Sequence, residues 1–135
     1  MKTLISTLAT AYILLIPVSS VAVETDKTLS FEVTPYKHTK IYCENDDNIK
    51  PSKNDFELLD YTALSSEQGD RFVLVTIKNT SSGQRLFNQS SVVAILSDCT
   101  RIRPLNIELT FSGNEVLTKQ LNFGINKYPI LKLIN

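Results

Sequence analysis

The chain contains one histidine, a residue whose side chain can exchange a proton near neutral pH. His38 lies in a polar stretch between Lys37 and Lys40. An imidazole serves as a general base or a metal ligand, but its sequence neighbours here are cations. The chain also lacks the Gly-x-Ser-x-Gly motif that would place a nucleophile on a sharp turn. We therefore expect a solvated surface histidine. A Ser–His–acid triad stays open, because its members meet in space and keep no fixed spacing in a sequence.

Carboxylates gather in the hydrophilic stretch of residues 44–55. Asp46, Asp47 and Asp55 provide oxygen ligands of the kind that Ca²⁺ prefers. An EF-hand loop needs Asp-x-Asp-x-Asp-Gly followed by a glutamate, and this stretch does not have that spacing. We expect a solvated loop without a metal or any other cofactor, and a calcium site is the alternative.

Arginines form a second group of charged candidates. Arg101 and Arg103 follow the second cysteine, and Arg85 lies in a polar segment, residues 80–90. A guanidinium group pairs bidentately with carboxylates and other anions, although arginines in a loop also simply face water or nearby acids. We expect any recognition to use loop residues, and the candidates are Asp46, Asp47, Asp55, Arg85, Phe87, Arg101 and Arg103.

The N-terminal segment has the layout of a secretory signal peptide. Lys2 supplies a positive charge, residues 4–18 are mostly apolar, and Ser20 and Ala22 are small residues at the −3 and −1 positions. The apolar run is too short for a typical membrane-spanning helix. The sequence therefore predicts a signal peptide at residues 1–22, cleaved after Ala22, and a mature domain at residues 23–135 without a membrane span. The expected location is the periplasm or the outside of the cell.

Two cysteines, Cys43 and Cys99, are present in this predicted exported chain. Disulfides persist in oxidising compartments, so we expect one intrachain bond between them. Closing a loop of this length restricts the unfolded chain by about 4 kcal/mol in the loop-entropy model. Free thiols and intermolecular bonds remain alternatives. The chain has no Cys-x-x-Cys motif and gives no argument for thiol redox catalysis.

Short runs of apolar residues separated by turn-forming residues indicate an all-β domain. The central stretch, residues 71–99, contains two strongly apolar runs, residues 72–77 and 92–96. In the first predicted strand, residues 29–33, the alternation places Leu29, Phe31 and Val33 towards the core. Further strands are expected at residues 37–43, 56–64, 71–79, 91–99, 105–111, 116–123 and 128–134. Seven or eight short strands of this kind predict an antiparallel sandwich of the immunoglobulin or fibronectin type.

Three segments resemble a known group of proteins. Residues 69–82 (GDRFVLVTIKNTSS), 91–98 (SVVAILSD) and 112–124 (SGNEVLTKQLNFG) are similar to small exported immunoglobulin-like domains of Gram-negative bacteria. A more distant similarity is to ApaG-type fibronectin-like domains. The resemblance implies a sandwich fold and carries over no catalytic or binding residue. In contrast to antibody domains, the chain has no Trp, and Ser97 stands two positions before Cys99.

The charge balance, 14 Lys+Arg against 14 Asp+Glu, gives no argument for binding nucleic acid. We expect an exported, non-catalytic binding domain that uses the loops at residues 44–55 and 80–90 to recognise an unknown protein or surface ligand. A subunit of a surface assembly, such as a pilus or an adhesin, is the alternative. A hydrolase is less favoured, because nothing places Glu57 and Asp60 in a cleft. The sequence does not predict the oligomeric state.

Overall fold

The computed structural model describes residues 28–44 and 49–135. The predicted signal peptide at residues 1–22 lies outside the described residues, and so do Asp46 and Asp47. The described residues contain no helix, and therefore none that is long and apolar enough to cross a membrane.

Nine strands make up the regular structure of the described residues. They are β1 (Ser30–Phe31), β2 (Phe56–Ser65), β3 (Asp70–Asn79), β4 (Arg85–Asn88), β5 (Val93–Leu96), β6 (Arg101–Ile102), β7 (Glu108–Phe111), β8 (Val116–Ile125) and β9 (Ile130–Ile134). Every strand pairing is antiparallel. The prediction of an all-β, antiparallel fold is confirmed. The count exceeds seven or eight because the short strands β4 and β6 were not predicted, while the predicted strand at residues 37–43 is absent.

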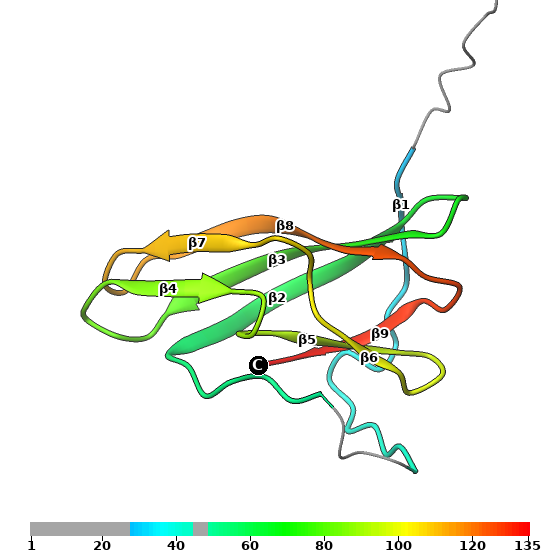
Figure 1. The fold of residues 1–135 in the computed structure, drawn as a ribbon, viewed down its shortest axis with the longest axis horizontal. Coiled ribbons are helices and arrows are strands. Elements are labelled where there is room, and N and C mark those ends of the chain that lie inside the picture. Colours follow the sequence, from blue (N-terminus) through cyan, green and yellow to red (C-terminus); the bar gives the residue numbers. More distant parts are fainter. Residues whose placement is uncertain (1–27, 45–48) are drawn as a thin grey trace, which may run out of the picture.

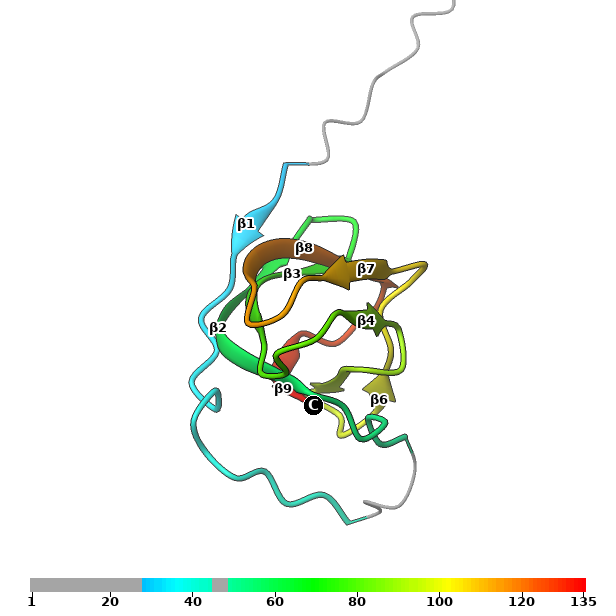
Figure 2. The ribbon, with the colours of Figure 1, turned by 90° about the vertical axis from the view of Figure 1, so that its left-hand side faces the viewer.

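The strands form two packed layers around one core. One sheet has the order β1-β2-β3-β8, a second pairs β4 with β7, and a third has the order β6-β5-β9. In Figure 1, β2, β3 and β8 lie above β5, β6 and β9, and β4 and β7 lie at the left-hand end. Figure 2 looks along the layers and shows the strands arranged around a common interior.

Strand β3 is the centre of the larger sheet, as its sequence pattern predicts. Val73, Val75 and Ile77 alternate along it and have no exposed surface. β3 pairs along almost its full length with β2 on one side and β8 on the other. Successive side chains of a strand point to opposite faces of the sheet, so every second residue of β3 points into the core. This explains why the long alternating runs were predicted with nearly correct bounds.

The second apolar run becomes β5, which is shorter than predicted. Val93, Ala94, Ile95 and Leu96 are all buried, because β5 lies between β6 and β9 and is covered on both faces. The strand ends before Cys99, since the backbone N–H of Cys99 donates to the Leu96 carbonyl in a turn.

An aromatic cluster fills the core beside β4 and β7. The ring centroids of Phe56 and Phe87 lie 5.1 Å apart, and those of Phe56 and Phe111 also lie 5.1 Å apart, both edge to face. Phe87 and Phe111 have no exposed surface. Strand β4, which carries Phe87, was not predicted, because four residues are too short for a periodic signal.

The predicted strand at residues 37–43 is wrong. Residues 35–39 form turns, with the Lys37 N–H donating to the Thr34 carbonyl and the Thr39 N–H donating to the Tyr36 carbonyl. The apparent alternation of Thr39, Ile41 and Cys43 does not correspond to a pleated strand. The chain here crosses the end of the sandwich as an irregular segment.

Strand β1 faces the opposite way from the prediction. Phe31 and Val33 are 74% and 91% exposed, whereas the Glu32 side chain turns inward and bonds to Arg71. The Arg71 Nη1 atom lies 2.7 Å from Glu32 Oε1. Arg71 also donates to the carbonyls of Asn126 and Lys127. The buried guanidinium needs an anion, and this requirement outweighs the burial of two apolar side chains at a sheet edge.

Two turns meet at one end of the molecule and are joined through Asn79. Its Nδ2 atom donates to the carbonyls of Gly83 and Ser112, each at 2.8 Å, and its Oδ1 atom accepts from the Ser81 N–H. A Cβ atom at Gly113 would lie 1.9 Å from the Ser82 carbonyl oxygen. Glycine is therefore required by close backbone approach, while Asn114 takes the left-handed conformation in this turn, with φ of 59°. We call this region, residues 79–83 with 112–115, the turn end.

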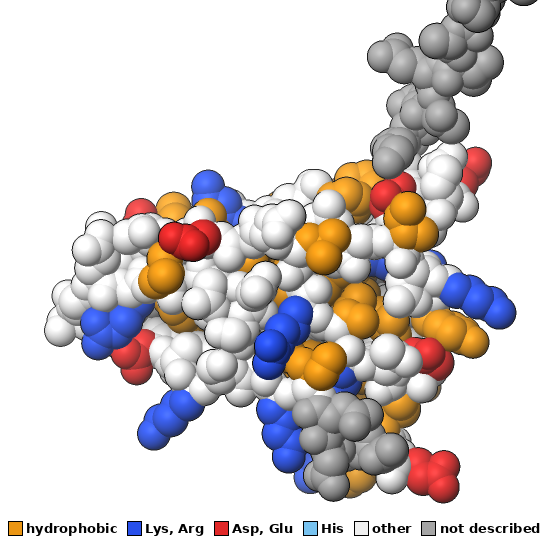
Figure 3. Space-filling model, in the orientation of Figure 1, with side chains coloured by type: hydrophobic (Ala, Val, Ile, Leu, Met, Phe, Trp, Pro, Cys, Tyr) orange, Lys and Arg blue, Asp and Glu red, His pale blue; other side chains and the backbone are white. Residues whose placement is uncertain are grey.

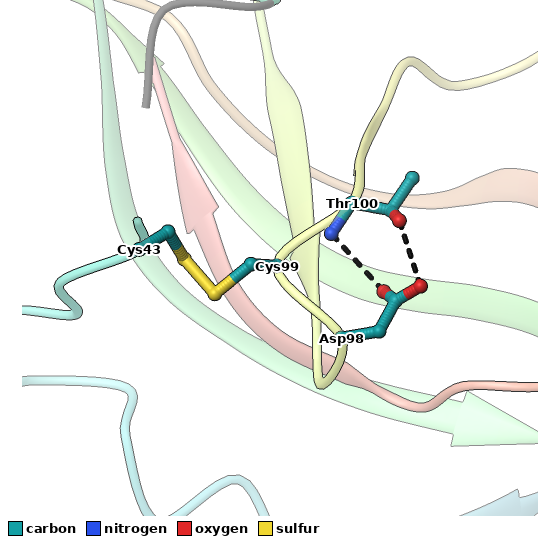
Figure 4. The surroundings of a disulfide bond; sticks show 4 residues. All are labelled: Cys43, Asp98, Cys99 and Thr100. Atoms are coloured by element: carbon teal, nitrogen blue, oxygen red, sulfur yellow. Dashed lines mark hydrogen bonds between the residues drawn. A yellow bond between two sulfur atoms is a disulfide. The ribbon is translucent and has the colours of Figure 1, made fainter. Parts of the chain in front are cut away.

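The predicted disulfide is present. Cys43 and Cys99 are bonded, with their Cα atoms 5.8 Å apart, and the described residues contain no free cysteine. Figure 4 shows that Cys99 follows Asp98 in the turn after β5, while Cys43 comes from the irregular segment before β2. Asp98 closes this turn by accepting from both the N–H and the hydroxyl of Thr100. The disulfide therefore ties the irregular segment to the smaller layer. It is compatible with an oxidising compartment.

Candidate functional site

The candidate recognition residues that the structure describes do not come together at one site. Asp55 and Arg85 form an exposed ion pair, with Asp55 Oδ2 2.6 Å from Arg85 Nε. Each satisfies the other at the surface, where such a pair contributes about 0–1 kcal/mol to stability. Phe87 has no exposed surface. Its place among the recognition residues is corrected, since a partner cannot touch a side chain that is completely inside the core.

The arginines after Cys99 bind the chain itself. Arg101 Nη1 donates to the Ile49 carbonyl at 3.2 Å, and Arg103 Nη2 donates to the Lys50 carbonyl at 3.3 Å. These bonds hold Ile49 and Lys50, within residues 44–55, close to β6 and to the residues that follow β6. In this structure the two guanidinium groups therefore have hydrogen-bond partners within the chain.

An open hollow lies beside the disulfide and gathers exposed aromatic and cationic side chains. Its volume is about 490 Å³, and its walls are formed by Tyr36, Lys40, Ile41, Tyr42, Ser97 and Leu131. We call it the tyrosine hollow. Tyr36 is 47% exposed and Tyr42 is 80% exposed. The Lys40 Nζ atom lies 5.1 Å from the centre of the Tyr42 ring, within the range of a cation–π contact.

Three contacts hold the segment that carries these tyrosines. Lys37 forms an ion pair with Asp60 on β2, and its Nζ atom lies 4.8 Å from the centre of the Tyr61 ring. Lys132 on β9 donates to the Thr39 carbonyl at 2.8 Å. The disulfide holds the far end of the segment at Cys43. A segment without regular structure is thus fixed at three points along its length.

The ionisable groups under this segment follow the same contacts. The hydrogen bond from Lys37, together with a backbone hydrogen bond and the lysine charge, lowers the pKa of the exposed Asp60 carboxyl. Burial raises the pKa of the Tyr61 hydroxyl, which also accepts a hydrogen bond from the Leu133 N–H. On the other side of the disulfide, the hydrogen bond from Thr100 lowers the pKa of the Asp98 carboxyl. Asp60 and Asp98 are therefore anions across the ordinary pH range, and both have partners.

Exposed hydrophobic side chains are not evenly spread. In the face shown in Figure 3, orange side chains gather towards the right-hand part, which is the end where β1 and β9 lie in Figure 1. The left-hand end, where the turns of the turn end lie, is mostly white and charged. Two further hollows, one beside Asn88 and Glu108 and one beside Gly69 and Lys127, have fewer aromatic or apolar walls.

Within residues 28–44 and 49–135, no group of three or more His, Cys, Asp or Glu side chains is placed to hold a metal ion. His38 is exposed. Asp46 and Asp47 lie outside the described residues, so the calcium alternative in the acidic stretch remains a prediction.

The tyrosine hollow was not predicted from the sequence. Its walls come from residues 36–42, 97 and 131, which are far apart in the chain. One local signal was present: two tyrosines interleaved with lysines in residues 34–43 (TPYKHTKIYC), immediately before a cysteine. Exposed tyrosines are typical of interfaces, because their rings are apolar and their hydroxyl groups can form hydrogen bonds.

Comparisons with protein-family models, with curated proteins and with solved structures give no match.

Proposed function

We propose that this chain is an exported binding domain without catalytic activity, and that it recognises a protein or a surface ligand at the tyrosine hollow. The observation that carries the proposal is the exposure of Tyr36 and Tyr42 around this hollow, on a segment that the disulfide and two lysines hold in place. Tyrosine supplies a large contact area with little conformational freedom to lose, and it is enriched in binding surfaces.

Support for export comes from the N-terminal pattern and from the disulfide, which suits an oxidising compartment. The similarity of residues 69–82 to small exported immunoglobulin-like domains agrees with both. Recognition at the end of a sandwich, on an irregular segment held by a rigid scaffold, is a common arrangement.

The test is affinity capture from the envelope and the culture medium of the source cells, with the tagged full chain as bait. We expect a reproducible partner whose recovery falls at least about tenfold with Tyr42→Ser, because truncating a central aromatic residue of an interface costs about 2 kcal/mol or more. The matched control is Tyr128→Ser. Tyr128 is 37% exposed and has Lys127 Nζ 5.5 Å from its ring centre, but it lies outside the hollow.

Recovery that falls equally with Tyr42→Ser and Tyr128→Ser would mean that exposed tyrosines act non-specifically, and the hollow would lose its role. A capture without any reproducible partner, or a chain that turns over a substrate in the same extracts, would contradict the proposal itself.

A further inference from the structure

The first strand leaves an apolar stripe uncovered at the edge of the larger sheet. β1 is the outermost strand in the order β1-β2-β3-β8, and Figure 2 shows it on the outside of β2. The inward turn of Glu32 towards Arg71 forces its neighbours Phe31 and Val33 outward, where they are 74% and 91% exposed. Both side chains are far more exposed than a folded domain usually leaves an aromatic or a β-branched residue.

The same strand also offers free backbone groups. Ser30 faces Ser65 in the ladder, and the Glu32 N–H donates to the Ala63 carbonyl at 2.8 Å. Ser30 and Glu32 therefore point their N–H and C=O groups towards β2. The residues that alternate with them, Leu29, Phe31 and Val33, point their backbone groups away from β2. No strand of the described chain pairs with this outer side of β1. An open strand edge is a template for pairing with another chain.

The sequence of this edge is nearly a palindrome. Residues 28–34 read TLSFEVT, with Phe31 at the centre. If a second copy lies antiparallel about a two-fold axis at Phe31, then Phe31 meets Phe31, Leu29 meets Val33, and Thr28 meets Thr34. Aromatic pairs, apolar pairs and threonine pairs directly opposite each other are favourable across antiparallel strands.

Charge does not oppose this arrangement. Glu32 is the one charged residue of residues 28–34, and its carboxylate is already held by Arg71 on the inner side of its own sheet. Pro35 follows and ends the pairing, because it has no backbone N–H to offer. The contact is therefore short, self-complementary and closed.

We infer that two copies of this chain pair through β1 as a symmetric dimer, in which the two four-stranded sheets join edge to edge. Phe31, Leu29 and Val33 lie at the residues whose backbone groups face outward, so each cross-strand pair exchanges two backbone hydrogen bonds with the partner copy. The same surface on both copies forms the interface, and the two-fold axis prevents further addition. This inference does not depend on the tyrosine hollow.

The first test is the mass of the full chain in solution, measured by analytical ultracentrifugation from about 1 to 200 µM. We expect a dimer that Phe31→Lys weakens at least about tenfold, since the substitution places two ammonium groups opposite each other at the axis. The control is Val116→Lys, because Val116 is an apolar residue of 47% exposure on β8, the other edge strand of the same sheet. A monomer throughout, a dimer that Phe31→Lys leaves unchanged, or an open series of larger oligomers would overturn the inference.

The second test fixes the register and does not require the dimer to be strong. Hydrogen-bonded antiparallel partners have Cα atoms about 5.5 Å apart, which is within the range of a disulfide. Phe31→Cys should therefore form an interchain disulfide on mild oxidation. Val33→Cys should not, because the two copies of residue 33 would lie about 13 Å apart along the strands. Equal cross-linking of both variants, or of neither, would contradict the proposed pairing.

Discussion

The two ends of the sandwich are built in different ways. At the turn end, Asn79 is completely buried, and its amide satisfies backbone groups of both turns. At the other end, residues 34–44 have no regular structure and expose tyrosines around a hollow, and a disulfide and two lysines hold them in place. The turn end is held together by the hydrogen bonds of the buried Asn79 side chain. The disulfide end is fixed in place but open on its surface.

This difference separates residues that maintain the fold from residues available for binding. A buried polar side chain that bonds to the backbone of two turns has a structural role, even where those turns are rich in Asn, Ser and Gly. Residues 34–44 are held by Lys37 and Cys43 of the segment itself and by Lys132 of β9, and these contacts leave Tyr36 and Tyr42 exposed. Substitutions at the two ends of the sandwich should therefore have different effects.

The largest effect is expected at the disulfide. Replacing both Cys43 and Cys99 by Ser should lower the free energy of unfolding by about 4 kcal/mol, since the unfolded chain regains the freedom that the crosslink removes. Denaturant unfolding measures this change. If the disulfide end is held as described, tryptic cleavage after Lys40 should also accelerate under native conditions. Unchanged cleavage at Lys40 would mean that the lysine contacts alone hold the segment.

A smaller loss is expected at the turn end. Gly113→Ala should destabilise the fold by about 3 kcal/mol, because the added Cβ would meet the Ser82 carbonyl oxygen at 1.9 Å and the two turns must move apart. Denaturant unfolding is again the measurement, and tryptic cleavage after Lys40 should stay as in the parent chain. Gly83→Ala is the control, since a Cβ there meets its nearest atom, a mobile arginine nitrogen, only at 3.3 Å. Equal losses for both glycines would contradict close approach as the reason.

The buried amide of Asn79 should rank next. Asn79→Ala leaves the Gly83 carbonyl and the Ser81 N–H without this partner and removes one of the two donors to the Ser112 carbonyl, which keeps the Glu115 N–H. We expect a loss of about 2 kcal/mol. Thr76→Ala on the outer face of the same strand, where the hydroxyl bonds only to the Thr118 hydroxyl, should cost less. The reverse order of these two losses would remove the structural role assigned to the turn end.

The long strands could be predicted from the sequence because their signal is local. In β3 the alternation continues along the ten-residue strand, so one ambiguous position does not change the prediction. The disulfide could be predicted because the chain has two cysteines and an N-terminal segment with the layout of a signal peptide. The predicted strand at residues 71–79 ends at Asn79 in the structure, but the hydrogen bond from Asn79 to the Ser112 carbonyl could not be foreseen, because the two residues are 33 positions apart in the chain.

The incorrect predictions concern side chains whose orientation or burial depends on a residue far away in the sequence. The alternation in residues 29–33 predicts Phe31 inside, and only Arg71, on another strand, reverses the face by binding Glu32. Phe87 was placed with the recognition loops because its neighbours are polar, yet it packs against Phe56 and Phe111 from other strands. The tyrosine hollow needs Ser97 and Leu131 to complete its walls. In each case the missing information is a tertiary contact, which periodicity does not contain.

The smallest predicted effect concerns Tyr61, which lies beneath the segment that carries the tyrosine hollow. Burial raises the pKa of its hydroxyl in the folded chain above the ordinary value of 10.0. The folded state then keeps a proton that the unfolded state releases, so the contribution of Tyr61 to stability is complete below pH 10 and is lost as the pH rises above it. Denaturant unfolding between pH 8 and 11 should show a steeper decline for the parent chain than for Tyr61→Phe. The control is Tyr42→Phe, which changes a tyrosine that is 80% exposed and should leave the decline as it is in the parent chain. Parallel curves for the parent and Tyr61→Phe would show that the base of the segment is open to water, and the contrast between a fixed support and an exposed binding surface would then not hold.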